Sequence, residues 1–187
     1  MNMKQIGIIS LLVLMLSFQL KGQGRFLTRE GHIKFFSQAP MENIEAHNYN
    51  VLSVLDLSRG QVAVDMLIKN FEFEKKLMQE HFNENYMESG KIPKSTYKGA
   101  FVVPEGLMNA TDGTYKIDVN GEISIHGVTK PLNQQIDLVV ENGKISTEFV
   151  FNVKVKDHDI KIPNMVVKNI AEEIEVTANF TYEPYER

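Results

Sequence analysis

The feature that most constrains the fold is a period of two in the apolar residues, which recurs along most of the chain after residue 60. Successive side chains of a β-strand point to opposite faces, so this period indicates strands with one apolar face. Four runs show it, at 114–119, 132–140, 145–155 and 174–180, and a longer run covers 62–73. No series of long helical segments alternates with these runs, which favours an all-β domain over an α/β domain.

Short turn signals separate the runs, including Asn-Gly pairs at 120–121 and 142–143. Both residues of such a pair tolerate positive φ, so we expect a tight hairpin at each of them. An antiparallel barrel and a two-sheet sandwich both satisfy this pattern, and periodicity alone does not separate them. A strand over 62–73 would be about 40 Å long, and a barrel built from such strands would have room for an elongated ligand.

Composition limits the classes of function. The chain has 187 residues, 43% of them hydrophobic, which fits one globular domain with a sizeable core. Its formal net charge is −4 and it contains no basic block, so no nucleic-acid-binding surface is expected. The absence of cysteine excludes disulfides, thiolate nucleophiles and cysteine-ligated zinc.

Residues 1–22 are expected to be a signal peptide. Lys4 precedes the apolar stretch Ile6–Leu16, which is too short for a helix that spans the ~30 Å core of a bilayer. Polar residues follow, and cleavage near Gly22 is expected, with an uncleaved membrane anchor as the alternative. Residues 23–187 would then form one acidic domain that is periplasmic or secreted, without the cysteine that a lipoprotein anchor needs.

The segment "LMQEHFNENYMES", at 77–89, departs from the period of two. The spacing of five of its residues predicts one face of a short amphipathic helix: Leu77, Met78, His81, Phe82 and Asn85. A single helix among strands is expected to pack across one end of the barrel or sandwich.

His81 lies between glutamates, but it does not form a known metal motif. Zinc-protease helices place two histidines on one face, and this helix has one. The remaining histidines lie on separate predicted strands or turns. We therefore expect no metal site and no cofactor, and a His81 side chain that is hydrogen-bonded within the fold.

Three segments together resemble the YceI-like family of exported bacterial proteins that bind lipids or polyisoprenoids: "FSQAPMENIEAHN" (36–48), "LMQEHFNENYMESGKIPKSTYKG" (77–99) and "GEISIHGVTKPL" (121–132). The resemblance extends over Gly24 to Tyr182. It implies an extended, antiparallel, lipocalin-like β-barrel with one short helix near one end and an apolar interior that holds a long-chain lipid. One departure is His158 in "DHDIKIP", where relatives often carry tyrosine.

The inward parity of the strands and helix then predicts the ligand-binding residues. These are Val64, Met66, Ile68, Phe71, Phe73, Leu77, Met78, Phe82, Phe101, Ile125, Phe149 and Phe151; the predicted set also includes His126, which points the other way from Ile125. For His126, either it contacts a polar head group together with Thr129 or it fixes the strand by a hydrogen bond, and we favour the second. Gly127 would allow a bend, and residues 129–131 would turn the chain into the next strand.

The predicted function is an exported, non-enzymatic protein that sequesters or carries a long-chain isoprenoid or other fatty lipid, with transient membrane contact. Two alternatives stay open: a secreted interaction or assembly module without ligand, and a secreted hydrolase or isomerase on the same barrel. The enzyme needs a nucleophile beside a base, or paired carboxylates in the cavity. The sequence has no G-x-S-x-G motif, and Asp65, Glu173 and Glu175 fall on the polar parity of their strands.

Overall fold

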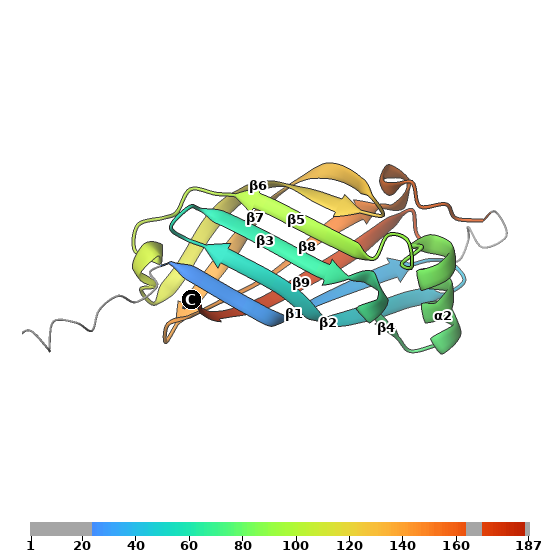
Figure 1. Cartoon of the computed structure of the whole chain (residues 1–187), viewed down its shortest axis with the longest axis horizontal. Helices are drawn as coiled ribbons and strands as arrows, with labels where there is room; N and C mark the ends of the chain where they lie inside the picture. Colours follow the sequence, from blue (N-terminus) through green and yellow to red (C-terminus); the bar gives the residue numbers. More distant parts are fainter. Residues whose placement is uncertain (1–23, 164–169, 186–187) are drawn as a thin grey trace, which may run out of the picture.

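The computed structural model describes residues 24–163 and 170–185, which form a closed antiparallel β-barrel (Figure 1). Each strand is hydrogen-bonded to its neighbour in the order β1-β9-β8-β7-β6-β5-β3-β2, and the β1–β2 pairing closes the ring. The lipocalin-like barrel is therefore confirmed, and the sandwich is excluded. The predicted signal peptide lies outside the described residues. The ring consists of β1 (Arg25–Gln38), β2 (Asn43–Asp56), β3 (Gln61–Leu67), β5 (Lys94–Ala100), β6 (Gly113–Ile125), β7 (Val128–Glu141), β8 (Lys144–Lys154) and β9 (Glu173–Pro184).

The run 62–73, predicted as one strand, is divided in two. After β3 the chain makes a short 3-10 turn, η1 (Ile68–Asn70), and then adds the two-residue strand β4 (Glu72–Phe73) to β2. The buried side chain of Asn48 in β2 donates a hydrogen bond to the carbonyl of Leu67 at 3.0 Å. This side-chain bond takes the place of a ladder partner where β3 ends, so the chain can leave the sheet there.

Helix α2 (Lys76–His81) continues as a single π turn over Phe82–Tyr86 and lies at one end of the barrel (Figure 1). Met78, Phe82 and Tyr86, each four residues apart, face the barrel interior. Leu77 is 62% exposed, so its predicted inward position is wrong. Asn85 is also exposed. The inward face lies one residue further along the helix than predicted. Within the described ranges no helix is long and apolar enough to cross a membrane.

The two Asn-Gly pairs have different structures. Asn142 and Gly143, with φ of 53° and 77°, form the predicted hairpin between β7 and β8. The pair at 120–121 instead lies inside β6, and the β6–β7 turn is made by His126 and Gly127 at φ of 50° and 77°. With the turn at 126–127, β6 and β7 pair without a break from Gly113–Val140 to Ile125–Val128. A turn at residue 120 would interrupt this ladder. The predicted turn at 129–131 is wrong for the same reason, since these residues belong to β7.

Gly121 has a packing role inside the barrel. It pairs with Gly99 of β5 and with Leu132 of β7. The ring of Tyr97 lies over this glycine pair, and its hydroxyl donates to the Leu132 carbonyl at 3.1 Å. A Cβ built on Gly121 would lie 2.4 Å from the carbonyl oxygen of Lys98 and 2.6 Å from the Tyr97 hydroxyl. The glycine therefore leaves the space through which the tyrosine spans three strands.

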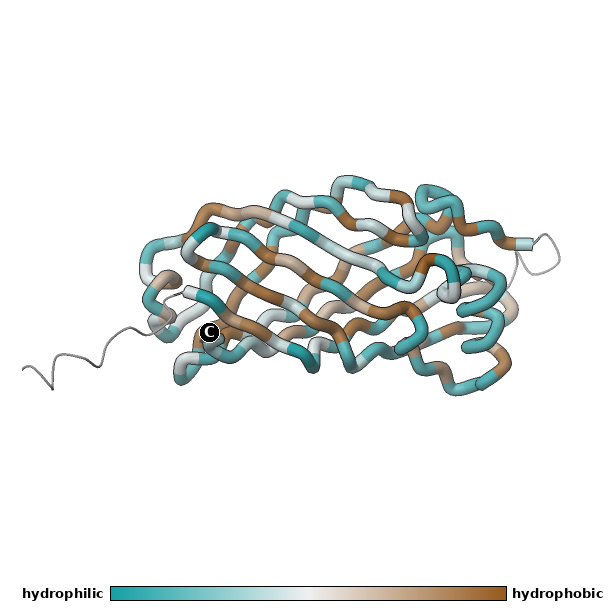
Figure 2. Tube along the Cα trace, viewed as in Figure 1, coloured by the Kyte–Doolittle hydropathy of each residue, from teal (hydrophilic) through white to brown (hydrophobic). Residues whose placement is uncertain are grey.

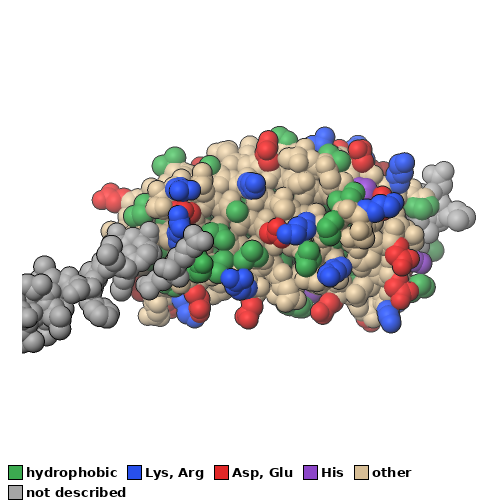
Figure 3. All heavy atoms as spheres, viewed as in Figure 1, with side chains coloured by type: hydrophobic (Ala, Val, Ile, Leu, Met, Phe, Trp, Pro, Cys, Tyr) green, Lys and Arg blue, Asp and Glu red, His purple; other side chains and the backbone are tan. Residues whose placement is uncertain are grey.

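The strands alternate apolar and polar residues along their length, as Figure 2 shows. The inward side chains near the β7–β8 hairpin are fully buried and include Leu138 and Ile145. At the same end, Leu57 and Leu107 are also fully buried; Leu107 begins the 3-10 turn η3 (Leu107–Asn109). The face of the barrel seen in Figure 3 carries charges of both signs with scattered apolar side chains. Exposed ion pairs of the barrel, such as Lys116 with Asp137, each contribute little stability.

An ordered group of polar rings lies on the outside of β1 and β2. Nε2 of His32 is 3.0 Å from Nδ1 of His47, and Nε2 of His47 is 3.0 Å from a Glu45 oxygen. The Tyr49 ring is nearly parallel to both imidazoles, with ring centroids 4.5 Å from His32 and 5.7 Å from His47. Burial is the largest cause that lowers the pKa of His32, and the nearby charges of His47 and Lys34 lower it further. The negative charge of Glu148 acts in the opposite direction.

This arrangement predicts a loss of stability in mild acid. Because the folded pKa of His32 is below its unfolded value of about 6.5, the unfolded chain binds a proton that the folded protein resists. The stabilisation is therefore complete above about pH 6.5 and is lost as the pH falls towards the folded pKa. Urea titrations at pH 7.5 and 5.5 give the free energy of unfolding at each pH. Between the two values of pH, this free energy should fall less for His32→Gln than for the wild type. The difference should be under about 1 kcal/mol, because the His32 ring is partly solvated. Equal losses would contradict this prediction.

Candidate functional site: the barrel cavity

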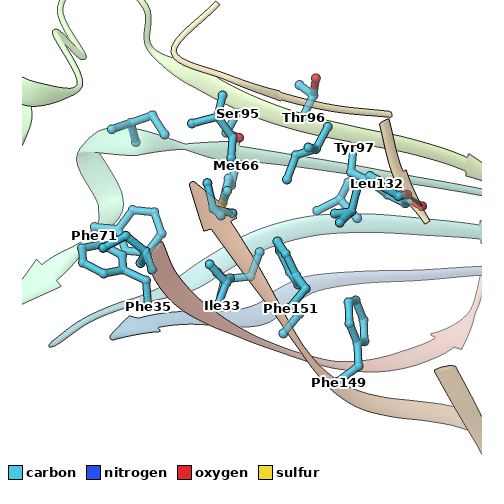
Figure 4. A pocket seen from close by; sticks show the side chains of 18 of the residues that line it. Ile33, Phe35, Met66, Phe71, Ser95, Thr96, Tyr97, Leu132, Phe149 and Phe151 are labelled. Atoms are coloured by element: carbon cyan, nitrogen blue, oxygen red, sulfur yellow. Dashed lines mark hydrogen bonds between the residues drawn. The ribbon is translucent and has the colours of Figure 1, made fainter. Parts of the chain in front are cut away.

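The barrel encloses a cavity of about 340 Å³, within the usual range for small-molecule sites. Every strand of the ring contributes side chains to its lining, and α2 adds Met78 at one end. Figure 4 shows Phe149 and Phe151 of β8 pointing into it, with Ile33 of β1 and Met66 of β3 nearby. The lining is overwhelmingly apolar because the inward parity of each strand is apolar.

Most of the predicted ligand-binding residues line this cavity. Eleven of the thirteen do so: Val64, Met66, Ile68, Phe71, Phe73, Met78, Phe82, Phe101, Ile125, Phe149 and Phe151. Their role in binding a ligand stays a prediction. The two others are Leu77, which points to solvent, and His126.

His126 is held by the protein rather than directed into the cavity. It occupies the left-handed region in the β6–β7 turn, which takes its side chain away from the inward parity. Its Nδ1 lies 3.1 Å from the carbonyl of His158, and Nδ1 of His158 lies 3.2 Å from the carbonyl of Val128. Each ring nitrogen can donate to the facing carbonyl in the Nδ1–H tautomer. The structure thus shows a hydrogen bond that ties His126 in the β6–β7 turn to η4, and a role of His126 in ligand binding stays a prediction. His158 is buried in the 3-10 turn η4 (Val155–His158).

Four phenylalanines pack together at the α2 end of the cavity. The ring centroid of Phe35 in β1 lies 5.3 Å from that of Phe71, 5.7 Å from that of Phe73 and 5.4 Å from that of Phe82. Phe82 of the helix is a further 5.0 Å from Phe73, in a tilted arrangement. The cluster fixes α2 on the barrel with favourable aromatic geometry. Phe35 was absent from the predicted site, although the spacing of Ile33, Phe35 and Ser37 carries the signal that places it there.

Several polar groups in the lining already bond to the protein. The Ser95 hydroxyl donates to the Ser124 carbonyl at 2.7 Å, and Tyr97 donates to Leu132 as described. The hydroxyls of Tyr182 and Ser53 are 2.8 Å apart and buried. Burial raises the pKa of Tyr182, and to a smaller degree burial also raises the pKa of Tyr97, so both phenols are neutral at ordinary pH. These hydroxyls are therefore not free to form hydrogen bonds with a polar ligand.

Among the buried polar side chains of the lining, Thr147 of β8 is the exception. Its side-chain oxygen is buried and has no hydrogen-bond partner, and the residue is only 5% exposed. An unsatisfied buried hydroxyl costs about 1–3 kcal/mol, so a neutral oxygen of a ligand would gain a partner here. Periodicity places Thr147 inside the barrel but cannot show that its hydroxyl is unbonded.

The described residues do not form a recognisable catalytic arrangement. The hydroxyls of Ser53 and Ser95 bond to a carbonyl or another hydroxyl, not to a histidine or carboxylate. Glu173 and Glu175 are exposed on the polar parity, as predicted. His81 is exposed at the edge of the cavity, and its ring makes no hydrogen bond to the described residues, so the predicted hydrogen bond of this side chain is not found there. No three metal-ligating side chains come together in the part of the chain that the structure describes.

Comparisons with known proteins agree with this architecture. Residues 13–182 match the YceI-like domain. A UPF0312 protein of Vibrio parahaemolyticus is 26% identical over 148 residues, and the match spans 76% of this chain and 66% of that relative's length.

Solved structures share the fold at low sequence identity. A polyisoprenoid binding domain from Saccharophagus degradans superimposes with a TM-score of 0.74 at 12% identity, covering 87% of this chain and 99% of that domain. BcnA of Burkholderia cenocepacia gives a TM-score of 0.62 at 13% identity, covering 81% and 95% of the two chains. The YCEI protein of Campylobacter jejuni gives 0.58 at 15% identity, covering 80% and 90%.

Proposed function

Because the chain belongs to the YceI-like domain family, we propose that it is a non-enzymatic carrier that holds a long-chain isoprenoid or similar lipid in its barrel cavity. The observation that carries this proposal is the apolar cavity lined by every strand of the ring. The polyisoprenoid-binding domain of Saccharophagus degradans, which shares the fold, supports the choice of ligand class.

Burial alone can supply the affinity. Each methylene removed from water contributes about 0.8 kcal/mol, so a chain of several five-carbon units gains many kcal/mol before the cost of immobilisation. Methionine lining residues such as Met66 and Met78 adapt to an irregular, branched chain because the thioether side chain is flexible. Specificity would then depend on the length and branching of the chain more than on its head group.

The polar end of the ligand is expected to be uncharged if it lies deep in the barrel. A buried charge without a partner is far more costly than a buried hydroxyl or carbonyl. The unbonded hydroxyl of Thr147 could accept from an alcohol or donate to a carbonyl oxygen. A charged head group would have to lie at the edge of the cavity, where His81 is exposed.

We also propose that the protein is exported and meets its lipid at a membrane surface. The apolar stretch Ile6–Leu16 after Lys4 supports export to the periplasm or beyond. A lipid with a long apolar tail has very low solubility in water, so a carrier has to take it from a membrane or another carrier.

Mass spectrometry of an organic extract tests the carrier function. The full chain would be expressed in a bacterial host with its export signal, purified without detergent and extracted. A stoichiometric isoprenoid or long acyl lipid is the expected result. No lipid in the extract, and none after incubation with vesicles made from total host lipid, would contradict the proposal and favour the ligand-free interaction module.

A further inference from the structure

The barrel wall is not equally closed on all sides. β7 and β8 are 14 and 11 residues long, yet they pair at only three positions: Val139–Ser146, Val140–Ile145 and Glu141–Lys144. On their other edges both strands are paired along their length, β7 with β6 and β8 with β9. Residues 128–138 of β7 and 147–154 of β8 therefore have no ladder partner on their shared side, and we call this gap the β7–β8 slot.

The slot lies over the cavity. The inward side chains of both unpaired stretches line the cavity: Leu132, Gln134 and Ile136 from β7 and Phe149, Phe151 and Val153 from β8. All six are partly exposed, as are the cavity-lining residues Val62 and Val64 of β3, a strand paired on both sides at these positions. Apolar side chains, without a backbone ladder, thus separate the cavity from the outside here.

The sequence is adapted to an edge at this place. Pro131 lies within β7, and proline has no N–H to donate, so in a strand it is confined to edges and bulges. The ladder with β6 continues past Pro131, which leaves the missing donor on the side of the slot. On the outer rim, Val139 and Val150 are 41% and 51% exposed. Val139 belongs to the last ladder pair, and the other outward side chains along the slot are mostly polar, among them Gln135, Asp137 and Asn152.

Both ends of the slot are fixed. The Asn142-Gly143 hairpin joins the strands at one end, next to the unbonded hydroxyl of Thr147. At the other end, the His158–Val128 and His126–His158 hydrogen bonds hold η4 against the start of β7. The strands between these points can separate further without breaking any β7–β8 hydrogen bond, because the ladder between them ends at Val139–Ser146.

We propose that the lipid chain enters and leaves the cavity sideways through the β7–β8 slot. This proposal rests on the carrier function. Passage along the barrel axis would have to displace the four-phenylalanine cluster at the α2 end or the buried leucines at the other end. Passage through the slot needs only rotation of side chains such as Phe149 and Phe151.

A chemical bridge across the slot tests this route, and the absence of native cysteines makes the labelling specific. Gln135→Cys in β7 and Asn152→Cys in β8 place two exposed thiols on either side of the slot. The double variant would be loaded with an anthranilate ester of geranylgeraniol and then joined with a short bismaleimide. The rate at which excess unlabelled geranylgeraniol displaces the fluorescent ester is measured, together with the equilibrium affinity.

A matched control shares one of the cysteines. Gln135→Cys with Asp118→Cys bridges β7 to β6 at two residues that face each other in a continuous ladder. A further variant, Lys75→Cys with Glu42→Cys, replaces the ion pair that joins the start of α2 to the β1–β2 loop and bridges the helix end.

The slot bridge should slow exchange at least tenfold with an unchanged equilibrium affinity, while the β6–β7 bridge leaves the rate unchanged. Equal exchange rates for the slot bridge and its β6–β7 control, or slowing only by the α2 bridge, would overturn the lateral route. If the unbridged protein binds neither the ester nor any lipid from vesicles, the carrier function itself fails, and this result is distinct from failure of the route.

Discussion

Replacing Gly121 by alanine is expected to destabilise the barrel by about 3 kcal/mol, which corresponds to a fall in Tm of roughly 10 °C for a domain of this size. The added methyl group would lie 2.4 Å from a backbone oxygen of β5, and this oxygen cannot move without disturbing the β5–β6 ladder. It would also displace the Tyr97 ring, which loses its hydrogen bond to Leu132. Thermal melting followed by circular dichroism measures the effect.

Gly90→Ala is the matched control for that measurement. No atom lies within 4 Å of a Cβ built on Gly90, so the methyl group meets no obstacle. Its stability should stay within about 0.5 kcal/mol of the wild type. A Gly121→Ala protein that melts at the wild-type temperature would show that Tyr97 does not require the space, and that the glycine pair has no packing role.

Val64→Glu should abolish lipid binding, with Kd raised more than about a hundredfold. The side chain of Val64 projects from β3 into the middle of the lining. A carboxylate there would either remain ionised beside the apolar chain, without a partner for its charge, or have to take up a proton at neutral pH. Both outcomes cost free energy that the wild-type valine does not. Because burial under the ligand raises the pKa of the new carboxyl, affinity should recover as the pH falls, while wild-type affinity should not.

Ala63→Glu provides the control on the same strand, one residue away. Ala63 is exposed on the outer face, so the same charge there should leave both affinity and stability nearly unchanged. Titration with the fluorescent isoprenoid ester gives both Kd values, and Val64→Gln separates the effect of charge from that of volume. Tight binding by a folded Val64→Glu protein would mean that the ligand does not occupy this cavity.

Strand identity and parity could be predicted from the sequence because they depend on local alternation. The inward faces of β6, β8 and β9, marked by Ile117, Phe149 and Val176, follow the period of two directly. Since one parity decides which whole face of a strand is buried, most cavity-lining side chains follow once the strands are known. The same reasoning could have added Ile33 and Phe35 of β1.

The errors arose where distant contacts override local signals. Asn120-Gly121 has the composition of a hairpin turn, but an unbroken ladder over the whole of β6 and the Tyr97 ring above Gly121 place the pair within the strand. The end of β3 depends on Asn48, which lies nineteen residues before the carbonyl that it binds. For Leu77, the helix continues into a π turn, and its inward face lies one residue further along the chain than the predicted face.

The β7–β8 slot could not be predicted from periodicity, because both strands alternate regularly on either side of it. Only Pro131 carries a local signal, and a proline in a strand run indicates an edge without showing which neighbour is missing. The unbonded state of Thr147 is likewise a property of the assembled barrel.

The pairing of β1 with β9 has a consequence for how the protein folds. Residues near the two ends of the chain, such as Phe35 and Val176, are neighbours in the closed ring. During synthesis the first eight strands can form no more than an open sheet with two free edges, and ring closure has to wait for the last strand. Such distant pairing makes folding slow and late, because a very long loop must close before the contacts form. The nascent chain would therefore stay unfolded long enough for chaperones to engage it.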